Sequence, residues 1–161
     1  MKIGIDFDRV LFKTDKFKKE VLFSEIESFQ ETYSQIDGVY SPKEHAEILN
    51  IPEDKILSCL DKASEYLYPD IALLEESPHE FVIVTRGDPV FQEEKVERSG
   101  ALGFVEDHVV VQDQDKDVDG IELLVDDLKK EIEDSGLKGY HFTRPEDSVK
   151  DLLDFIEREL E

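Results

Sequence analysis

Short apolar runs recur along the chain, and polar or turn-forming residues bound each of them. Runs of this kind, rich in Val, Ile and Leu, are typical of strands that are buried on both faces of a sheet. We therefore predict strands at residues 2–7, 81–85, 108–113 and 121–127, with a less apolar fifth strand at 139–142.

Helical patterns alternate with the later strands. The segment 88–100 has a helix start, a helical period and a terminal glycine, and the segment 126–136 has the same features. The segment 144–161 carries an apolar stripe that includes Val149 and Ile156. Strands that alternate with helices pair in parallel through right-handed crossovers. The predicted fold class is therefore α/β, with a Rossmann-like parallel sheet.

Residues 14–67 interrupt this alternation directly after the first strand. The segment has no convincing strand pattern and contains several helical stretches. Residues 14–33 are predicted to form one long helix, and another helix begins with Ser41 as a cap and Pro42 at the first helical position. We interpret the segment as a small all-helical cap inserted into the α/β core. The predicted division is a core of residues 1–13 and 68–161 and a cap of residues 14–67.

The composition is that of a folded, strongly acidic protein. Hydrophobic residues make up 39% of the 161 positions, and the formal net charge is -22. This charge argues against a general basic surface for nucleic acid, and an anionic substrate would need local cations at its site. One cysteine, no long apolar run and no signal peptide predict a cytoplasmic protein without a membrane partner. The sequence does not indicate an oligomeric state.

Polar side chains follow the predicted strands. Residues two apart on a strand point to the same side, so Asp6 and Asp8 can reach one bound group together. Ligands of parallel α/β sheets bind at the carboxyl ends of the strands. The polar residues expected at this edge are Asp6, Asp8, Thr85, Arg86, Lys116, Asp126 and Asp127.

The predicted edge contains four carboxylates, which would repel one another and raise their own pKa values. A divalent cation removes this penalty, and ligand sets made only of oxygen atoms suit Mg²⁺. The sequence therefore predicts a magnesium site. The four histidines show no metal-ligand spacing and are expected at the surface or in packing; they are His45, His79, His108 and His141.

Four motifs in order resemble the haloacid dehalogenase-like (HAD) superfamily. The segment "DFDRV" is similar to its first motif, "VIVT" to its second, Lys116 to its third and "LLVDD" to its fourth. The helical segment lies between the first two motifs, where this family places its C1-type cap. The resemblance covers the whole chain.

The resemblance implies a division of chemical roles. Asp6 would attack phosphorus and form an aspartyl phosphate. Asp8 would protonate the leaving oxygen and then deprotonate the hydrolytic water. Thr85 and the main-chain amide of Arg86 would hold phosphate oxygens, and Lys116 would neutralise the nucleophile and the phosphoryl group.

The resemblance also implies how Mg²⁺ is held. Its ligands would be Asp6, the main-chain carbonyl of Asp8, and Asp127, with Asp126 acting beside it through water. The implied activity is a Mg²⁺-dependent phosphatase acting on a small phosphorylated metabolite. A phosphomutase or phosphotransferase with the same nucleophile, and a catalytically silent HAD-like binding protein, are the alternatives.

Three positions depart from the family pattern or compete with it. Arg9 stands where the family often has glycine, and either reaches an anionic substrate or lies along the surface. Lys13 stands where many relatives with this cap have an acidic residue. Lys95, in the helix after the second motif, is the rival of Lys116 for the lysine role.

Overall fold

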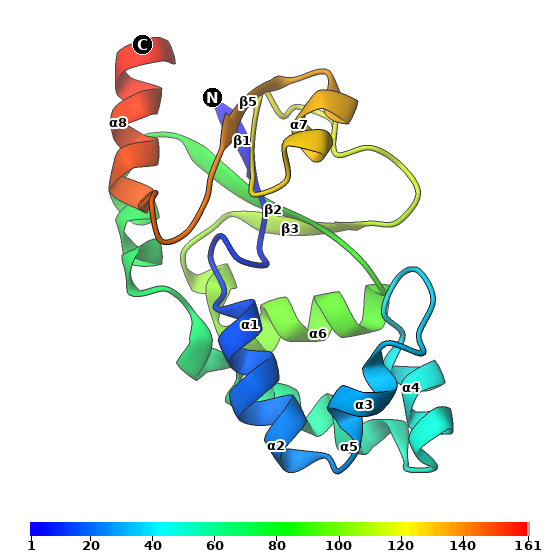
Figure 1. The fold of residues 1–161 in the computed structure, drawn as a ribbon. Helices are drawn as coiled ribbons and strands as arrows, with labels where there is room; N and C mark the ends of the chain where they lie inside the picture. Colours follow the sequence, from blue (N-terminus) through cyan, green and yellow to red (C-terminus); the bar gives the residue numbers. More distant parts are fainter. Residues whose placement is uncertain (161) are drawn as a thin grey trace.

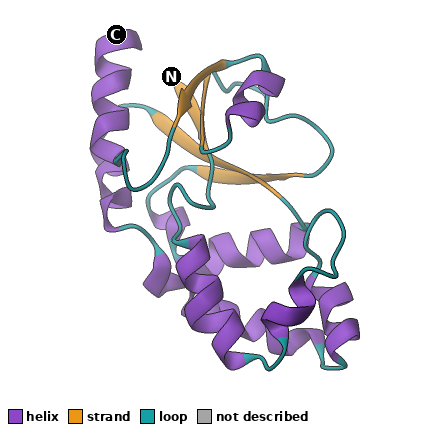
Figure 2. Ribbon diagram, in the orientation of Figure 1, coloured by secondary structure: helices purple, strands orange, loops and turns teal. Residues whose placement is uncertain are grey.

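Five parallel strands form the central sheet of the computed structural model, which describes residues 1–160 (Figures 1 and 2). The spatial order is β3-β2-β1-β4-β5, and every neighbouring pair is parallel. The predicted Rossmann-like α/β class is confirmed. The strands are β1 (Lys2–Ile5), β2 (Glu80–Arg86), β3 (Asp107–Val111), β4 (Leu123–Asp126) and β5 (Lys138–His141).

Alternate residues of the central strands pack on opposite faces of the sheet. Ile3, Ile5 and Ile83 belong to the main core, which also contains apolar side chains of the helices that follow β2 and β5. Val82 and Val84 belong to a smaller cluster on the other face. Because both faces are covered, these strands are continuously apolar and not alternating.

Three helices follow the later strands, as predicted: α6 (Pro89–Ser99), α7 (Lys129–Ser135) and α8 (Val149–Leu160). Asp88 caps α6 by accepting a hydrogen bond from the amide of Phe91 at 2.9 Å. The glycine that ends α6, Gly100, has a φ of 83°, a left-handed conformation that glycine adopts readily. A short 3₁₀ turn, η4 (Ala101–Gly103), follows α6. The predicted end of the last helix, residue 161, lies outside the described residues.

Helical elements occupy the chain between β1 and β2. In Figure 1 most of them gather on the side of the sheet toward which β1 runs, with α6 between them and the sheet, whereas the last one before β2 packs beside α8. Their bounds are α1 (Thr14–Phe17), the π-helical η1 (Lys18–Leu22), α2 (Phe23–Glu25), α3 (Phe29–Tyr33), α4 (Pro42–Leu49), α5 (Glu53–Leu57), and the 3₁₀ elements η2 (Ser58–Tyr66) and η3 (Pro69–Glu76).

The prediction of one long helix over residues 14–33 is wrong, because the structure breaks this segment between residues 26 and 28. Ile26 is extended, and Ser28 has a φ of 64°, so the helical hydrogen-bond ladder cannot continue. The break turns the chain and lets Phe29 enter the core. The 3₁₀ element η3 after residue 68 was not predicted.

Two short segments connect the helical elements to the sheet, and they lie against each other. The amide of Lys13 donates to the carbonyl of Tyr66 at 2.7 Å, and the amide of Tyr68 donates to the carbonyl of Leu11 at 2.9 Å. A bridge between Phe12 and Leu67 completes this neck. We propose that core and cap divide here, at 13/14 and 67/68.

Among residues 1–160, no helix combines the length and the apolar character that a membrane span requires.

Candidate active site

Three carboxylates come together at the carboxyl ends of β1 and β4. The amide of Asp6 donates to the carbonyl of Val125 at 2.8 Å, which fixes the end of β1 beside the end of β4. One carboxylate oxygen from each of Asp6, Asp126 and Asp127 lies within 4.8 Å of the others. Asp6 and Asp126 are buried, and Asp127 is partly exposed. Together they form the acidic cluster of this structure.

Lys116 lies beside this cluster on the loop between β3 and β4. Its side chain is only 2% exposed, and its Nζ atom donates to Asp6 Oδ1 at 3.1 Å and to Asp126 Oδ2 at 2.6 Å. Glu131 Oε2 is 3.7 Å from the same ammonium group. The lysine predicted from the third motif therefore contacts the predicted nucleophile directly.

Burial and the neighbouring charges together set the pKa values in the cluster. Burial, with the nearby Asp126 and Asp127 carboxyls, raises the pKa of Asp6 well above its ordinary value, although Lys116 opposes the shift. Burial also raises the pKa of Asp126. For Lys116, burial lowers the pKa but Asp6 and Asp126 raise it more, so the ammonium stays charged. One lysine thus neutralises only part of the negative charge of three carboxylates.

The two members of the acidic pair have different surroundings. Asp126 accepts from Lys116 through Oδ2 and from the amide of Leu128 through Oδ1, the latter at 2.9 Å. Asp127 lines an open cavity. Its carboxyl lies close to that of Asp6 and helps to raise the pKa of Asp6. Asp127 is therefore the more accessible of the pair to a ligand.

Asp8 lies away from the acidic cluster and has its own set of partners. Its Oδ1 atom accepts from Lys95 Nζ at 2.7 Å and from Thr14 Oγ1 at 2.9 Å, and its Oδ2 atom accepts from Gln92 Nε2 at 2.9 Å. Burial raises the pKa of Asp8, but the Lys95 charge and these hydrogen bonds lower it more, to about 2. Asp8 is therefore an ionised carboxylate at neutral pH.

Thr85 lies at the end of β2 and is 1% exposed. Its hydroxyl oxygen accepts from Gln92 Nε2 at 2.7 Å, which leaves the hydroxyl hydrogen available to a phosphate oxygen. Gln92 thus links Thr85 to Asp8, because its side-chain nitrogen donates to both.

The Arg86 side chain is already occupied by the protein. Its guanidinium makes a two-point contact with Glu131, with Nε and Nη2 each 2.8 Å from a carboxylate oxygen. It also donates to the carbonyls of Gln112 and Gln114, the latter at 3.0 Å. These bonds tie the end of β2 to α7 and to the loop after β3. Only the main chain of Arg86 is left for the phosphate role that the sequence predicts.

Two cavities flank this edge of the sheet and share Arg9 and Thr14 as lining residues. The cap cavity, of about 200 Å³, lies between helical segment and core and includes Asp8, Tyr33 and Tyr40. The β5 cavity, of about 380 Å³, lies on the other side and includes Asp127 and Arg144. The volume of the β5 cavity falls in the range typical of small-molecule sites, and that of the cap cavity lies below it.

Arg9 has a backbone conformation that is uncommon for a residue with a side chain. Its φ is 64°, in the left-handed region. Its amide donates to Thr14 Oγ1 at 3.1 Å, and its guanidinium pairs with the exposed Asp15 at 2.9 Å. Glycine adopts this left-handed conformation more readily than arginine does.

Three residues of this site were not predicted from the sequence: Thr14, Gln92 and Glu131. Gln92 and Lys95 are three residues apart on α6 and therefore share a helix face. Both lie on the same side of α6 as the apolar Phe91 and Val96, a placement that could have suggested a common buried partner. For Glu131, in the first turn of α7, nothing in the sequence shows whether the side chain faces the site or the solvent.

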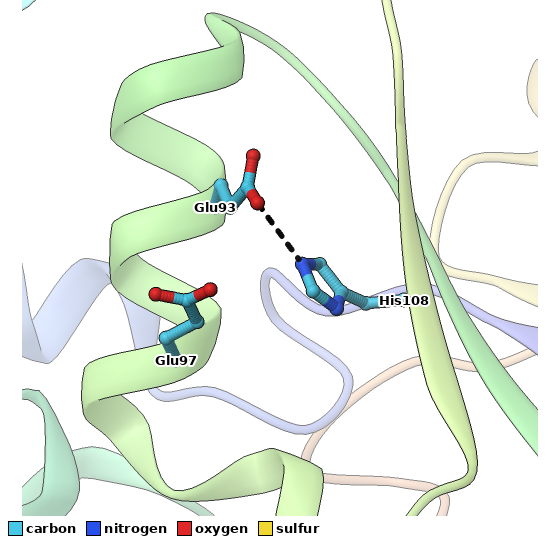
Figure 3. A group of neighbouring side chains, drawn as sticks. All are labelled: Glu93, Glu97 and His108. Carbon is cyan, nitrogen blue, oxygen red and sulfur yellow. Dashed lines mark ion pairs between the residues drawn. The ribbon is translucent and has the colours of Figure 1, made fainter.

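A second group of metal-binding residue types lies apart from the predicted site, on α6 and β3. Glu93 and Glu97 project from α6 toward His108 (Figure 3), and His108 Nε2 is 4.0 Å from Glu93 Oε1. Sequence spacing did not reveal this group because its members come from two elements. Both glutamates are exposed, and acidic groups of this kind are common without an ion, so we assign the group no role.

Comparisons with known proteins identify the fold. No protein-family model and no curated protein matches the sequence. YfnB from Bacillus subtilis, a structure described as a HAD-hydrolase bound to magnesium, is 15% identical; the match has a TM-score of 0.58 and covers 86% of this chain and 84% of that chain.

Two further solved structures match nearly the whole chain at the same TM-score of 0.58. L-2-haloacid dehalogenase from Xanthobacter autotrophicus is 14% identical, with 99% of this chain and 83% of that chain covered. A protein from Clostridium acetobutylicum described as a predicted phosphatase is 13% identical, with 98% of each chain covered. The chain therefore has the fold of the haloacid dehalogenase-like hydrolases, with its helical elements between β1 and β2.

Proposed function

We propose that this protein is a Mg²⁺-dependent phosphatase that hydrolyses the phosphoric monoester of a small phosphorylated metabolite through an aspartyl-phosphate intermediate. The observation that supports this best is the position of Asp6, buried at the strand edge beside two further carboxylates and in contact with Lys116. The adjoining β5 cavity has the size expected for a small substrate.

The acidic cluster fits Mg²⁺. Its donors are carboxylate oxygens alone, the type that this hard cation prefers, and Lys116 leaves part of their charge uncompensated. Asp6, Asp127 and the main-chain carbonyl of Asp8 would hold the ion, with Asp126 beside it. When bound, Mg²⁺ would offset the repulsion between the anionic nucleophile and the anionic phosphoryl group.

Asp6 attacks phosphorus, and the oxygen of the leaving alcohol departs as the new bond to Asp6 forms. Lys116 donates to Asp6 and neutralises the charge of this carboxylate, so that the anionic phosphoryl group can approach it. The hydroxyl of Thr85 and the main-chain amide of Arg86 hold phosphate oxygens. These groups lie at the ends of neighbouring strands β1 and β2, so one phosphate can contact both.

Proton transfer falls to Asp8 and Lys95. The Lys95 ammonium holds a proton against the ionised Asp8 carboxylate. That proton can pass through Asp8 to the leaving oxygen. Asp8 is then a base for the water that hydrolyses the aspartyl phosphate. Its pKa of about 2 keeps the carboxylate ionised at neutral pH, which is the form that accepts a proton in the second step.

The test is hydrolysis of an aryl phosphate with Mg²⁺ and with EDTA. We expect Mg²⁺-dependent turnover that is lost in Asp6→Asn. Asp119→Asn, an exposed aspartate on the loop after β3, is the matched control and should retain activity. Turnover that persists in Asp6→Asn would exclude the proposed nucleophile, and turnover in EDTA would exclude the metal.

A further inference from the structure

The β5 cavity carries positive charge in a strongly acidic protein. Four basic side chains line it, against two acidic ones. The whole chain has 19 basic and 41 acidic residues, so this local balance is reversed. None of these basic side chains takes part in the reaction proposed above. They are Arg9, Lys13, Lys16 and Arg144.

The cavity opens beside the proposed reaction centre. Asp127 is one of its lining residues, and the Asp127 carboxylate belongs to the acidic cluster that includes Asp6. The residues after β5 form another part of the wall. A molecule whose phosphate contacts Asp6 can therefore extend past Asp127 into this cavity.

Two of the cations have hydrogen-bond donors to spare. Among the described residues Lys13 forms no ion pair; its Nζ atom lies over the Tyr68 ring, 5.6 Å from the ring centre. Arg9 uses two of the five N–H groups of its guanidinium on Asp15, so three are left. Both side chains can bind an anion without breaking an existing contact.

Arg144 has a different role, because its guanidinium is engaged by the protein. It contacts both carboxylate oxygens of Asp70 at 2.8 Å and the carbonyl of Val10 at 2.9 and 3.1 Å. It also stacks on Tyr68, 4.0 Å from the ring centre. Arg144 therefore forms a fixed wall whose charge is compensated by Asp70, while Arg9 and Lys13 have donors left for a ligand.

The backbone at Arg9 supports a functional reason for its side chain. A left-handed conformation costs a residue with a Cβ atom about 1–2 kcal/mol, and glycine avoids most of this cost. Both side chains of the ion pair between Arg9 and Asp15 are exposed, so the pair contributes little to stability. An arginine that is unfavourable for folding at this position makes physical sense if its charge serves binding.

We propose that the β5 cavity binds a second anionic group of the substrate, a phosphate or a carboxylate, through Arg9 and Lys13. The substrate class is then a small molecule with two anionic groups: the reacting phosphoryl group at Asp6 and a second anion that lies in the β5 cavity. This inference rests on the proposed phosphatase function for the identity of the reacting group. It makes Arg9 and Lys13 the residues that determine specificity.

The experiment measures binding and needs no turnover. Three ligands that resist hydrolysis are titrated calorimetrically into the Mg²⁺-loaded protein: ethylphosphonate, 3-phosphonopropionate and ethane-1,2-bisphosphonate. We expect at least one of the two ligands with a second anion to bind about tenfold more tightly than ethylphosphonate. Which of them does so distinguishes a carboxylate from a phosphate.

Variants assign the preference to the cavity. Lys13→Ala and Arg9→Gly should each reduce the ratio of affinities severalfold, and Arg9→Lys should retain more of it than Arg9→Gly. Lys43→Ala removes an exposed lysine from α4 and should leave the ratio unchanged. Arg9→Gly suits its left-handed backbone, so it tests the side chain without a loss of folding.

Equal binding of all three ligands by the wild-type protein would overturn the inference, as would an unchanged ratio in both Lys13→Ala and Arg9→Gly. The two proposals fail separately. Mg²⁺-dependent hydrolysis of an aryl phosphate without any preference for the second anion would leave the phosphatase and remove the anion site. A preference for ligands with a second anion, without hydrolysis of the aryl phosphate, would leave the anion site and remove the phosphatase.

Discussion

Lys95 Nζ lies 2.7 Å from Asp8 Oδ1, and this contact joins α6 to the end of β1. A second lysine, Lys116, contacts Asp6 and Asp126 from the loop after β3. The structure thus gives each aspartate of the first motif its own ammonium group. Lys95 is 5% exposed, so its charge acts on Asp8 with little screening by solvent.

Lys95→Met tests the proton-transfer pair. The change removes the ammonium but keeps most of the side-chain volume, and it leaves Asp8 with only Gln92 and Thr14 as partners. The pKa of Asp8 should then rise above about 2, because the charge that lowers it is lost. We expect kcat for the aryl phosphate to fall at least about tenfold.

The pH dependence of that variant gives an independent readout. Since Asp8 must be ionised to act as a base, the acid limb of the kcat profile should move to higher pH. Lys130→Met, at an exposed lysine of α7, is the matched control. A kcat loss without movement of the acid limb would assign Lys95 a role in packing alone.

Metal binding should appear as added stability. A ligand that binds the folded state alone raises the free energy of unfolding by mass action. Mg²⁺ should therefore raise the Tm of the wild-type protein in a concentration-dependent manner, and Asp127→Asn should remove most of this increase. Asp119→Asn should keep it. Equal increases in the two variants would exclude Asp127 as a ligand.

The Arg86–Glu131 contact predicts strong coupling between two elements. Both side chains are largely buried, so removal of one partner leaves the charge of the other uncompensated. Arg86→Met and Glu131→Gln should each lower the free energy of unfolding by about 1–3 kcal/mol. The double variant should lose much less than the sum, which urea unfolding of all four proteins measures. Additive losses would show that the pair does not interact.

Asp70 predicts a pH-dependent contribution to stability. Burial raises the pKa of this carboxyl, but hydrogen bonds from Arg144 and from the amide of Val149, with the Arg144 charge, lower it more. A group whose pKa is lower in the folded state stabilises the protein above its unfolded pKa, about 3.9 for aspartate. That contribution is lost as the pH falls through the folded-state pKa.

Asp70→Asn should therefore destabilise the protein most at neutral pH. We expect the difference in unfolding free energy between Asp70→Asn and the wild-type protein to shrink below about pH 4. Urea unfolding at neutral pH and at about pH 3 measures this. A difference that is the same at both pH values would contradict an electrostatic role for Asp70.

The sheet could be predicted because its strands are buried on both faces. A continuous apolar run as short as 81–85, with helical patterns on either side of it, fits a buried strand much better than a helix. The break at Ser28 could not be predicted, since a left-handed serine leaves no mark in the apolar pattern. It depends on the packing of Phe29 against the rest of the helical segment.

Within the site, contacts that follow from strand order could be predicted, and contacts that depend on tertiary packing could not. The approach of Asp6, Asp126 and Asp127 follows from strand order, because parallel strands bring their carboxyl ends to one edge. The pairing of Asp8 with Lys95 depends on how α6 is rotated about its axis, and 87 positions separate the two residues. No local pattern encodes that rotation.

The neck between residues 11–13 and 66–68 has a consequence for how this architecture can diversify. The inserted chain leaves the core and returns to it through hydrogen-bonded neighbours, so its two ends are already closed. The entropy of closing such a loop grows only with the logarithm of its length, about 0.6 kcal/mol for each doubling. Insertions of very different size can therefore replace one another at this neck while the strand edge that carries Asp6 keeps its geometry.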